Sequence, residues 1–157
     1  MPVRKLEKFL DGKGINYVRI THSTAYTAQE TAAAAHVPGK ALAKTVILKT
    51  DGKMIMAVLP ASRKLDLGLL REAVGVNKVE IANETEFKDM FPECDIGAIP
   101  PFGNLYGMDV ISEGILAENE EIAFNAGSHT ELGRLSYKDF LELVKPNVAS
   151  FSSTRQA

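Results

Sequence analysis

Apolar residues at the start of the chain change from helical spacing to strand spacing within a few residues. Those of segment 3–10 are three or four positions apart, which predicts an amphipathic helix that two glycines end, and segment 15–20 predicts a strand. Thr27 and Glu30 then form a capping-box pattern, in which a hydroxyl and a carboxylate satisfy the first unpaired amides of a helix. An alanine-rich helix is therefore expected up to segment 37–39.

The middle of the chain predicts a hairpin of two central strands. Segments 44–49 and 53–59 are almost continuously apolar and flank Asp51-Gly52, a strong hairpin signal. Such strands are expected inside a sheet that is covered on both faces. Segment 65–74 then predicts a helix, and segment 78–81 predicts a short strand.

The remaining elements complete an α+β pattern. A second capping box at 83–86 predicts a short helix, segments 106–111, 121–125 and 130–135 predict strands, and Ser136 caps a last helix. Hairpins outnumber crossovers, which favours a mixed, mostly antiparallel sheet, curled like a barrel and flanked by helices. We expect a single domain over residues 1–150 and a flexible, polar C-terminal tail over residues 151–157.

The stretch from Gly97 to Gly103 predicts a stiff loop with a defined shape. Its two adjacent prolines, Pro100 and Pro101, cannot donate backbone hydrogen bonds, and its flanking glycines permit backbone angles closed to other residues. Backbone amides near the two glycines could then point at a ligand. The alternative is a tight connection between two strands, for which proline and glycine are the usual residues.

Composition narrows the classes of partner and cofactor. The 157 residues carry a net charge of −2, which argues against broad electrostatic binding of duplex DNA, and no apolar run is long enough to span a membrane. The single cysteine, Cys94, cannot form an internal disulfide, so the chain suits a reducing cytoplasm. The three histidines are far apart in sequence, so we expect neither a metal nor another cofactor.

Several side chains could carry chemistry. Lys44 begins an apolar strand, where a lysine either reaches solvent or holds a phosphate or carboxylate. His129 could act as a general base or position a substrate, or be an ordinary polar loop residue. A serine triad of Ser128, His129 and Asp139 is disfavoured because adjacent side chains on an extended segment point opposite ways. Cys94 has no neighbour in sequence that would lower its pKa.

These residues together resemble the YbaK/prolyl-tRNA-synthetase-associated editing domain family. The resemblance rests on Lys44 and the apolar strand after it, the Gly97–Gly103 loop that ends in Pro-Phe-Gly, and a late Asn-Ala-Gly turn at Gly127. It extends from about Thr21 to Pro146, and His22 also fits it. The family folds as a mixed α/β domain with a curled sheet and hydrolyses mischarged aminoacyl-tRNAs, mostly small amino acids on tRNA-Pro.

The resemblance implies an aminoacyl-tRNA deacylase that acts in trans, and the expected substrate is a small amino acid such as alanine on tRNA-Pro. The expected catalytic residues are Lys44, Gly97 and Gly103, and the expected substrate-binding residues are Thr45, Ile99, Pro101, Phe102, Gly127 and His129. Ala98 and Ile99 replace the glycine and the serine or cysteine of many relatives, so the pocket should be more apolar. Thr45 stands where subfamilies differ, which leaves the amino acid removed open.

The physical chemistry is compatible with that activity. An aminoacyl ester is already activated, so positioning of water and stabilisation of the developing oxyanion can suffice for hydrolysis. The expected partner is the acceptor end of aminoacyl-tRNA, with Lys40, Lys44, Arg63 and Lys64 as a basic rim. Prolyl-tRNA synthetase is a possible further partner that the sequence does not decide. The protein is expected to be a monomer or a weak dimer. The rival interpretations are a non-catalytic module that binds a tRNA end or nucleotide, and an esterase acting through Ser128 or Cys94.

Overall fold

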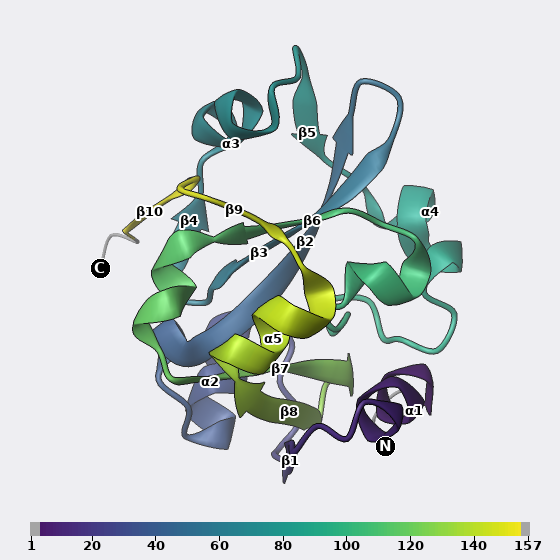
Figure 1. Ribbon diagram of the computed structural model, residues 1–157, viewed down its shortest axis with the longest axis vertical. Helices are drawn as coiled ribbons and strands as arrows, with labels where there is room; N and C mark the ends of the chain where they lie inside the picture. Colours follow the sequence, from purple (N-terminus) through teal and green to yellow (C-terminus); the bar gives the residue numbers. More distant parts are fainter. Residues whose placement is uncertain (1–3, 155–157) are drawn as a thin grey trace.

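The computed structural model describes residues 4–154, which form an eight-stranded sheet and a small two-stranded sheet of β4 and β10, with helices around them (Figure 1). The helices are α1 (Arg4–Gly12), α2 (Ala28–Ala35), α3 (Leu67–Val74), α4 (Glu84–Phe87) and α5 (Tyr137–Val144). The strands are β1 (Val18–Thr21), β2 (Leu42–Thr50), β3 (Met54–Pro60), β4 (Arg63–Leu65), β5 (Val79–Ile81), β6 (Val110–Glu113), β7 (Glu121–Ser128), β8 (Glu131–Ser136), β9 (Asn147–Ala149) and β10 (Ser152–Thr154). Short 3₁₀ helices are η1 (Gly39–Ala41), η2 (Lys88–Met90), η3 (Gly103–Tyr106) and η4 (Gly114–Glu118).

Helix ends follow the local sequence signals. Thr27 accepts a hydrogen bond from the backbone of Glu30, and the Glu30 side chain accepts one from the Thr27 backbone, so the predicted capping box is present at α2. A second capping box starts α4, and Ser136 caps α5, both as predicted. Gly75 ends α3 with φ +75°, a left-handed conformation that favours glycine. Local capping therefore fixes where these helices begin or end.

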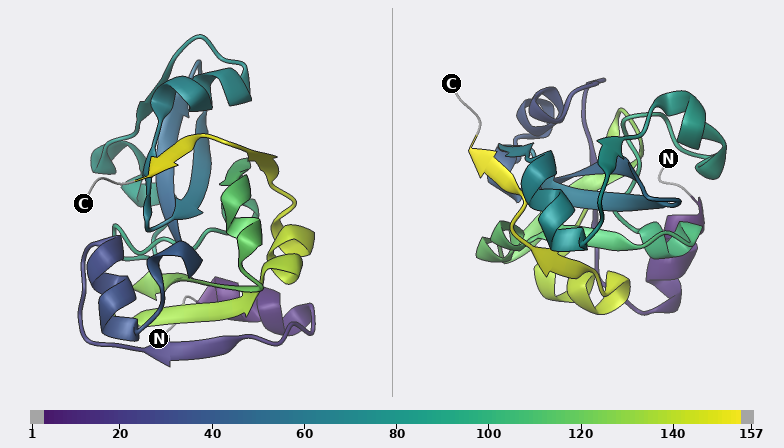
Figure 2. Two further views of the ribbon diagram at one scale, coloured as in Figure 1. Left: turned by 90° about the vertical axis from the view of Figure 1, so that its left-hand side faces the viewer. Right: turned by 90° about the horizontal axis from the view of Figure 1, so that it is seen from above.

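The predicted hairpin is the centre of the sheet. β2 and β3 pair antiparallel, with Ile47 opposite Met56, and Gly52 adopts φ +104° in the connecting turn. The strand order is β1-β8-β7-β2-β3-β6-β9, and β5 also pairs with β2. Figure 2 shows the β2–β3 hairpin rising from β7, β8 and β1.

Side chains from the two faces of the hairpin enter different clusters. On one face, Ala43 and Ile47 join the main core with residues of α1, α5 and the loop after α4. On the other face, Leu42 packs with Ala32 of α2, and Leu48 packs with Leu70 of α3. The expectation that these strands are covered on both faces is confirmed, and the α2 side is the one that concerns the site.

The sheet is mixed and open. The pairs β2–β7, β3–β6 and β6–β9 are parallel, and the other described pairs are antiparallel. The prediction of a mixed sheet flanked by helices is confirmed. The barrel-like curl is not confirmed, because within residues 4–154 the strand order runs from β1 to β9 as an open path.

Two sequence predictions need correction. Segment 106–111 is not a strand throughout, since η3 and a turn occupy its start and β6 begins at Val110. The predicted flexible tail is wrong for residues 151–154, because Phe151 is fully buried and β10 pairs with β4. The buried Glu113 carboxylate accepts hydrogen bonds from the Phe151 amide at 2.9 Å and the Ser152 hydroxyl at 2.6 Å. Residues 1–3 and 155–157 lie outside the described part of the chain.

Candidate active site

The predicted Gly/Pro loop docks against the end of β7. The Asp95 amide donates to the Gly127 carbonyl at 2.7 Å, and the Gly127 amide donates to the Ala98 carbonyl at 2.9 Å. Gly127 has φ +104° and lies within the β7–β8 irregularity between Asn125 and Ser128. Two glycine-containing segments that are distant in sequence therefore meet, and their backbones hold each other in place.

His129 completes this contact. A side-chain carbon added at Gly97 would lie 3.5 Å from His129 Cε1 and 4.0 Å from the Tyr26 carbonyl oxygen. The Ala25 amide donates to the His129 carbonyl at 3.1 Å, which holds the segment before α2 against the β7–β8 turn. The structure thus brings together Gly97, Gly127 and His129, and it adds Tyr26, which the sequence analysis did not single out.

Tyr26 presents an exposed ring at this place. Its side chain lies with the ring centroid 4.8 Å from that of His129, at an interplanar angle of 54°. Tyr26 is 69% exposed, although it immediately precedes the capping residue of α2. The ring is therefore supported on one side and open to solvent on the other.

Lys44 lies on the side of the sheet that carries α2. Side chains alternate along a strand, so Lys44 shares the face of Leu42, which packs against Ala32 of α2. Its half-buried ammonium donates a hydrogen bond to the Arg63 carbonyl oxygen at 3.0 Å. The ammonium group is therefore on the α2 side of the sheet.

Asn125 is a polar neighbour that the sequence analysis did not list as a site residue. Leu42 of β2 pairs with Ala123 of β7, and both belong to the cluster under α2. Lys44 follows Leu42 by two residues on β2, and Asn125 follows Ala123 by two residues on β7. Because side chains alternate along a strand, the Lys44 and Asn125 side chains are on the same sheet face as Leu42 and Ala123. Asn125 is buried, and the Asn-Ala-Gly sequence was its only signal.

β2 pairs with two different strands along its length, and the change occurs near Lys44. Its first residues, Leu42 and Ala43, pair with β7, whereas Leu48 to Thr50 pair with β5. Segment 44–47 lies between these two pairings. The strand edge beside Lys44 therefore lies where β7 and β5 separate.

The predicted substrate-binding residues Ile99, Pro101 and Phe102 are buried. Phe102 is fully enclosed, with its ring 5.1 Å from that of Phe124 and 6.1 Å from that of Phe140. Ile99 belongs to the same core cluster. These side chains anchor the loop from behind and do not form an exposed apolar pocket wall. Large apolar side chains are stabilised by burial, and those of this Pro-rich loop are buried in the core instead of lining a surface pocket.

Gly103 is required by packing. An added side-chain carbon there would lie 2.6 Å from Val110 Cγ2 and 2.7 Å from the Met108 carbonyl oxygen, closer than atoms can approach. The Gly103 carbonyl also accepts a hydrogen bond from the Met108 amide at 2.9 Å. This glycine closes the loop onto the next segment and is not brought next to His129 by the contacts described here.

Thr45 points away from Lys44. It follows Lys44 directly, so its side chain shares the core-facing side of Ala43 and Ile47. Its hydroxyl oxygen is buried and has no hydrogen-bond partner within the described residues. Lys44 and Thr45 therefore do not share one sheet face, as adjacent strand residues cannot.

The residues of the expected basic rim differ in their surroundings. Lys40 of η1 and Lys64 of β4 are exposed, and the Gly39 carbonyl joins these elements by accepting from the Ser62 amide at 3.3 Å. The Arg63 guanidinium, in contrast, donates to the Ser152 hydroxyl at 3.0 Å and the Ser152 carbonyl at 2.8 Å. Arg63 thus holds β10, while Lys40, Lys44 and Lys64 supply the positive charge of this region.

The geometry does not favour a hydroxyl or thiol nucleophile. Ser128 Oγ lies 3.3 Å from Thr130 Oγ1, and its described hydrogen bonds involve Thr130. Burial raises the pKa of the Cys94 thiol, and its Sγ lies 3.6 Å from the Tyr106 hydroxyl. A protonated thiol is a poor nucleophile.

His22 is a buried histidine beside this region. Its Nδ1 lies 2.7 Å from the Ser23 carbonyl oxygen and must donate to it, because a carbonyl only accepts. Nε2 is buried and has no partner within the described residues. The His22 amide donates to the Thr130 carbonyl at 2.8 Å, so this histidine links β1 to the turn that carries His129.

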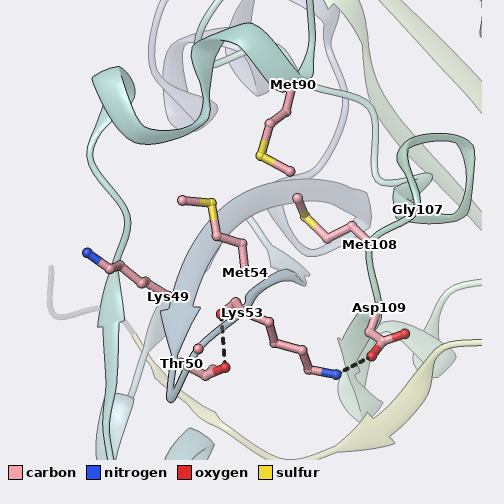
Figure 3. A pocket seen from close by; sticks show the side chains of 9 residues that line it. Lys49, Thr50, Lys53, Met54, Met90, Gly107, Met108 and Asp109 are labelled. Atoms are coloured by element: carbon pink, nitrogen blue, oxygen red, sulfur yellow. Dashed lines mark hydrogen bonds and ion pairs between the residues drawn. The ribbon is translucent and has the colours of Figure 1, made fainter.

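A separate open cavity of about 700 Å³ lies at the other end of the hairpin (Figure 3). The side chains of Met54, Met90 and Met108 converge on it, and an ion pair between Lys53 and Asp109, at 2.7 Å, borders it. It contains none of the predicted site residues. Within the described residues, no three histidine, cysteine or acidic side chains are grouped to hold a metal ion, and no helix is long and apolar enough to cross a membrane.

A family model matches most of the chain. The model of the aminoacyl-tRNA editing domain matches residues 22–143, which include Lys44, the Gly97 loop and His129. The chain belongs to the aminoacyl-tRNA editing domain family, and membership in it supports an aminoacyl-tRNA deacylase, a hydrolase of ester bonds. The identification of the family from sequence motifs is thereby confirmed.

Named relatives give the more specific likeness. The chain is 28% identical over 159 residues to the multifunctional Ser/Thr-tRNA deacylase ProXp-y of Escherichia coli K12, covering 96% of this chain and 93% of that protein. The O157:H7 protein of the same name matches equally.

Solved structures share the fold. The crystal structure of the hypothetical protein APE2540 superimposes with a TM-score of 0.85 at 21% identity, covering 96% of this chain and all of that one. A candidate trans-editing enzyme for prolyl-tRNA synthetase superimposes with a TM-score of 0.82 at 23% identity, covering 96% of each chain. At these identities the likeness concerns the fold alone.

Proposed function

We propose that this protein hydrolyses the ester bond of tRNA mischarged with a small amino acid, acting in trans through Lys44 and the residues around the Gly97–His129 contact. The observations that support the proposal are that the Gly97 loop is hydrogen-bonded to the end of β7 beside His129, and that Lys44 is on the sheet face of Leu42, which packs under α2. A stiff backbone beside an ammonium group suits a reaction that needs positioning and charge stabilisation.

Lys44 holds the anionic or polar part of the substrate. Its ammonium group is half-buried at a strand edge, where lower solvent screening strengthens its attraction for a phosphate of the acceptor end or for the terminal ribose. Asn125, on the same face, offers an amide that can bond the ribose hydroxyls. Lys40 and Lys64 guide the phosphates that precede the terminal nucleotide.

The Gly97 amide receives the developing oxyanion. Gly97 is exposed, and within residues 4–154 its N–H has no protein acceptor, whereas the Gly127 amide already donates to Ala98. This assigns the role to Gly97 and makes Gly127 a positioning residue. The attacking water is activated by the substrate's neighbouring ribose hydroxyl, since neither a thiolate nor a serine–histidine pair is formed here.

Size selection comes from the rigid loop backbone. Ile99 and Phe102 are fixed in the core behind it, so the loop cannot retreat to admit a larger amino acid. A pocket of fixed size excludes a larger guest but discriminates poorly against a smaller one, as in a second editing sieve. Proline is expected to be excluded, and alanine to be admitted. Serine, which is smaller than proline, is also an expected substrate, because the curated relative is named a Ser/Thr-tRNA deacylase.

The experiment is a panel of tRNA charged with alanine, serine, threonine, cysteine or proline, scored for release of the amino acid. We expect release of at least one small amino acid from tRNA-Pro or its own tRNA, and retention of proline on tRNA-Pro. Adding prolyl-tRNA synthetase to each reaction tests whether this partner raises the rate. Release of proline as fast as alanine or serine would contradict the size argument.

The second candidate function is a non-catalytic module that holds a tRNA end. The same ammonium group and glycine loop would serve it, and the net charge of −2 is compatible with a small local contact. In that case all charged tRNAs of the panel would stay charged in the presence of protein that measurably binds them.

A further inference from the structure

The Tyr26 ring lies beside His129 and Gly97 of the candidate site and has an open face. It is 69% exposed, the largest exposed fraction among the exposed large hydrophobic side chains of the described residues. A fully flexible surface ring would be unremarkable. This ring is instead held against His129, with the centroids 4.8 Å apart, and its backbone carbonyl lies beside Gly97.

The backbone under Tyr26 is fixed from both sides. On one side, the Ala25 amide donates to the His129 carbonyl at 3.1 Å. On the other, Thr27 begins α2 through a complete capping box. Holding an aromatic ring in one place lowers the entropy lost when a planar ligand stacks on it.

Electrostatic attraction alone would give the protein only a low affinity for RNA. Its net charge is −2, and the Arg63 guanidinium of the expected basic rim donates to Ser152 of β10. Proteins that bind unpaired nucleotides combine phosphate contacts with aromatic surfaces on which bases stack, and each stacked base contributes appreciably to binding. An exposed tyrosine beside the ester-binding loop is such a surface.

We propose that Tyr26, supported by His129, is the stacking surface for the nucleobase at the acceptor end of the substrate. The inference rests on the proposed function, because it takes the unpaired 3′ nucleotide of an aminoacyl-tRNA as the ligand. Tyr26 binds the base, His129 positions Tyr26, and the stacked base places the ester next to the Gly97 amide. Tyr26 therefore contributes to binding of the nucleotide and not to recognition of the amino acid.

The binding experiment uses an RNA minihelix whose 3′ end carries amide-linked serine, which cannot be hydrolysed, and 2-aminopurine in place of the terminal adenine. Stacking on Tyr26 should quench the emission of 2-aminopurine when the wild-type protein binds. Tyr26→Phe keeps the ring and should keep the quenching. Tyr26→Ala should abolish it and raise the Kd at least about fivefold. Ile81→Ala removes another exposed apolar side chain, on β5, and should match wild type.

The kinetic experiment separates base from amino acid. Deacylation is measured with seryl minihelices that end either in adenosine or in an abasic ribose. Tyr26→Ala should lower kcat/KM at least about fivefold for the adenosine substrate and should leave the abasic substrate unchanged. An equal loss on both substrates would overturn the proposal, because Tyr26 would then act on the amino acid or on the fold.

The two experiments also distinguish this inference from the proposed function. Quenching that depends on the Tyr26 ring, without release of any amino acid, would support stacking and contradict the deacylase. Release of the amino acid at wild-type rates by Tyr26→Ala, or a wild-type complex without quenching, would overturn stacking and leave the deacylase standing. Failure of the wild-type protein to bind the minihelix would also overturn it.

Discussion

The environments of Cys94 and Ser128 make neither side chain a suitable nucleophile. Cys94 is half-buried, and burial raises the pKa of its thiol above the usual value, so the thiolate is scarce at neutral pH. Ser128 is bonded to Thr130 and has no described contact with a base. Both residues are therefore structural.

Replacing Cys94 or Ser128 by alanine should leave deacylation nearly intact. In the Cys94→Ala and Ser128→Ala variants, the expected rate of amino acid release lies within about twofold of wild type, or about 0.4 kcal/mol in the barrier. The rates are measured under single-turnover conditions. Loss of activity in either folded variant would favour the esterase interpretation and its covalent intermediate.

The sequence singled out the backbone of the candidate site more readily than its surface. Lys44, Gly97, Gly127 and His129 were proposed because a lysine at a strand start, glycines beside prolines and a polar turn each have local signals. Tyr26 was not singled out, because its contact with His129, which is distant in sequence, is formed only in the folded chain.

Phe102 illustrates the opposite error. In sequence an aromatic residue within a Pro/Gly loop could equally face a ligand or the core, and its three aromatic neighbours come from α1, β7 and α5. Thr45 was similarly misplaced by its proximity to Lys44, although strand alternation separates the two side chains. Long-range packing decides both cases.

At the scale of elements, the short C-terminal strand is part of the fold. Phe151 is fully buried between the hairpin and α3, in a cluster with Leu48, Leu59 and Leu70. Arg63 and Glu113 hold the neighbouring Ser152 by hydrogen bonds. β10 therefore closes the side of the sheet next to β4.

Phe151→Ala should destabilise the protein by about 3 to 5 kcal/mol, because it removes a buried ring and leaves a cavity. Val148→Ala, which shortens an exposed side chain on β9, should change stability by less than about 0.5 kcal/mol. Urea unfolding followed by circular dichroism measures both. Equal midpoints for the two variants would mean that residue 151 is not packed in solution.

The predictability of the elements follows from how local their signals are. Capping boxes and the Asp51-Gly52 turn are read within four residues, so α2, α4 and the β2–β3 hairpin were predicted. β4, β9 and β10 each span three residues and exist through pairing with distant strands, which no local pattern encodes.

At the scale of the whole molecule, charge limits how the protein can bind RNA. With a net charge of −2, attraction for the body of a tRNA is weak, and Lys40, Lys44 and Lys64 are the cations expected near the acceptor end. Binding should therefore depend on a few phosphate contacts together with stacking and the aminoacyl group.

The affinity for aminoacyl-tRNA should consequently fall only moderately with salt. Three contacts to single-stranded phosphates predict a slope of log K against log salt of about −2. The slope is obtained from filter binding of amide-linked aminoacyl minihelix, and Lys64→Ala should reduce its magnitude by about 0.7. A slope several times steeper would mean that the protein contacts many more phosphates than these three lysines can account for.

The central claim is that the Lys44 ammonium group acts on the ester-bearing end of the substrate. The most direct measurement is the single-turnover release of the amino acid from its best tRNA by wild type, Lys44→Ala and Lys49→Ala. Lys49 is the matched control, since it lies on the same strand but is exposed and paired with Glu86. We predict that Lys44→Ala slows release more than about tenfold, or about 1.4 kcal/mol, at unchanged unfolding midpoint, while Lys49→Ala releases at the wild-type rate. Equal rates for Lys44→Ala and wild type would contradict the account.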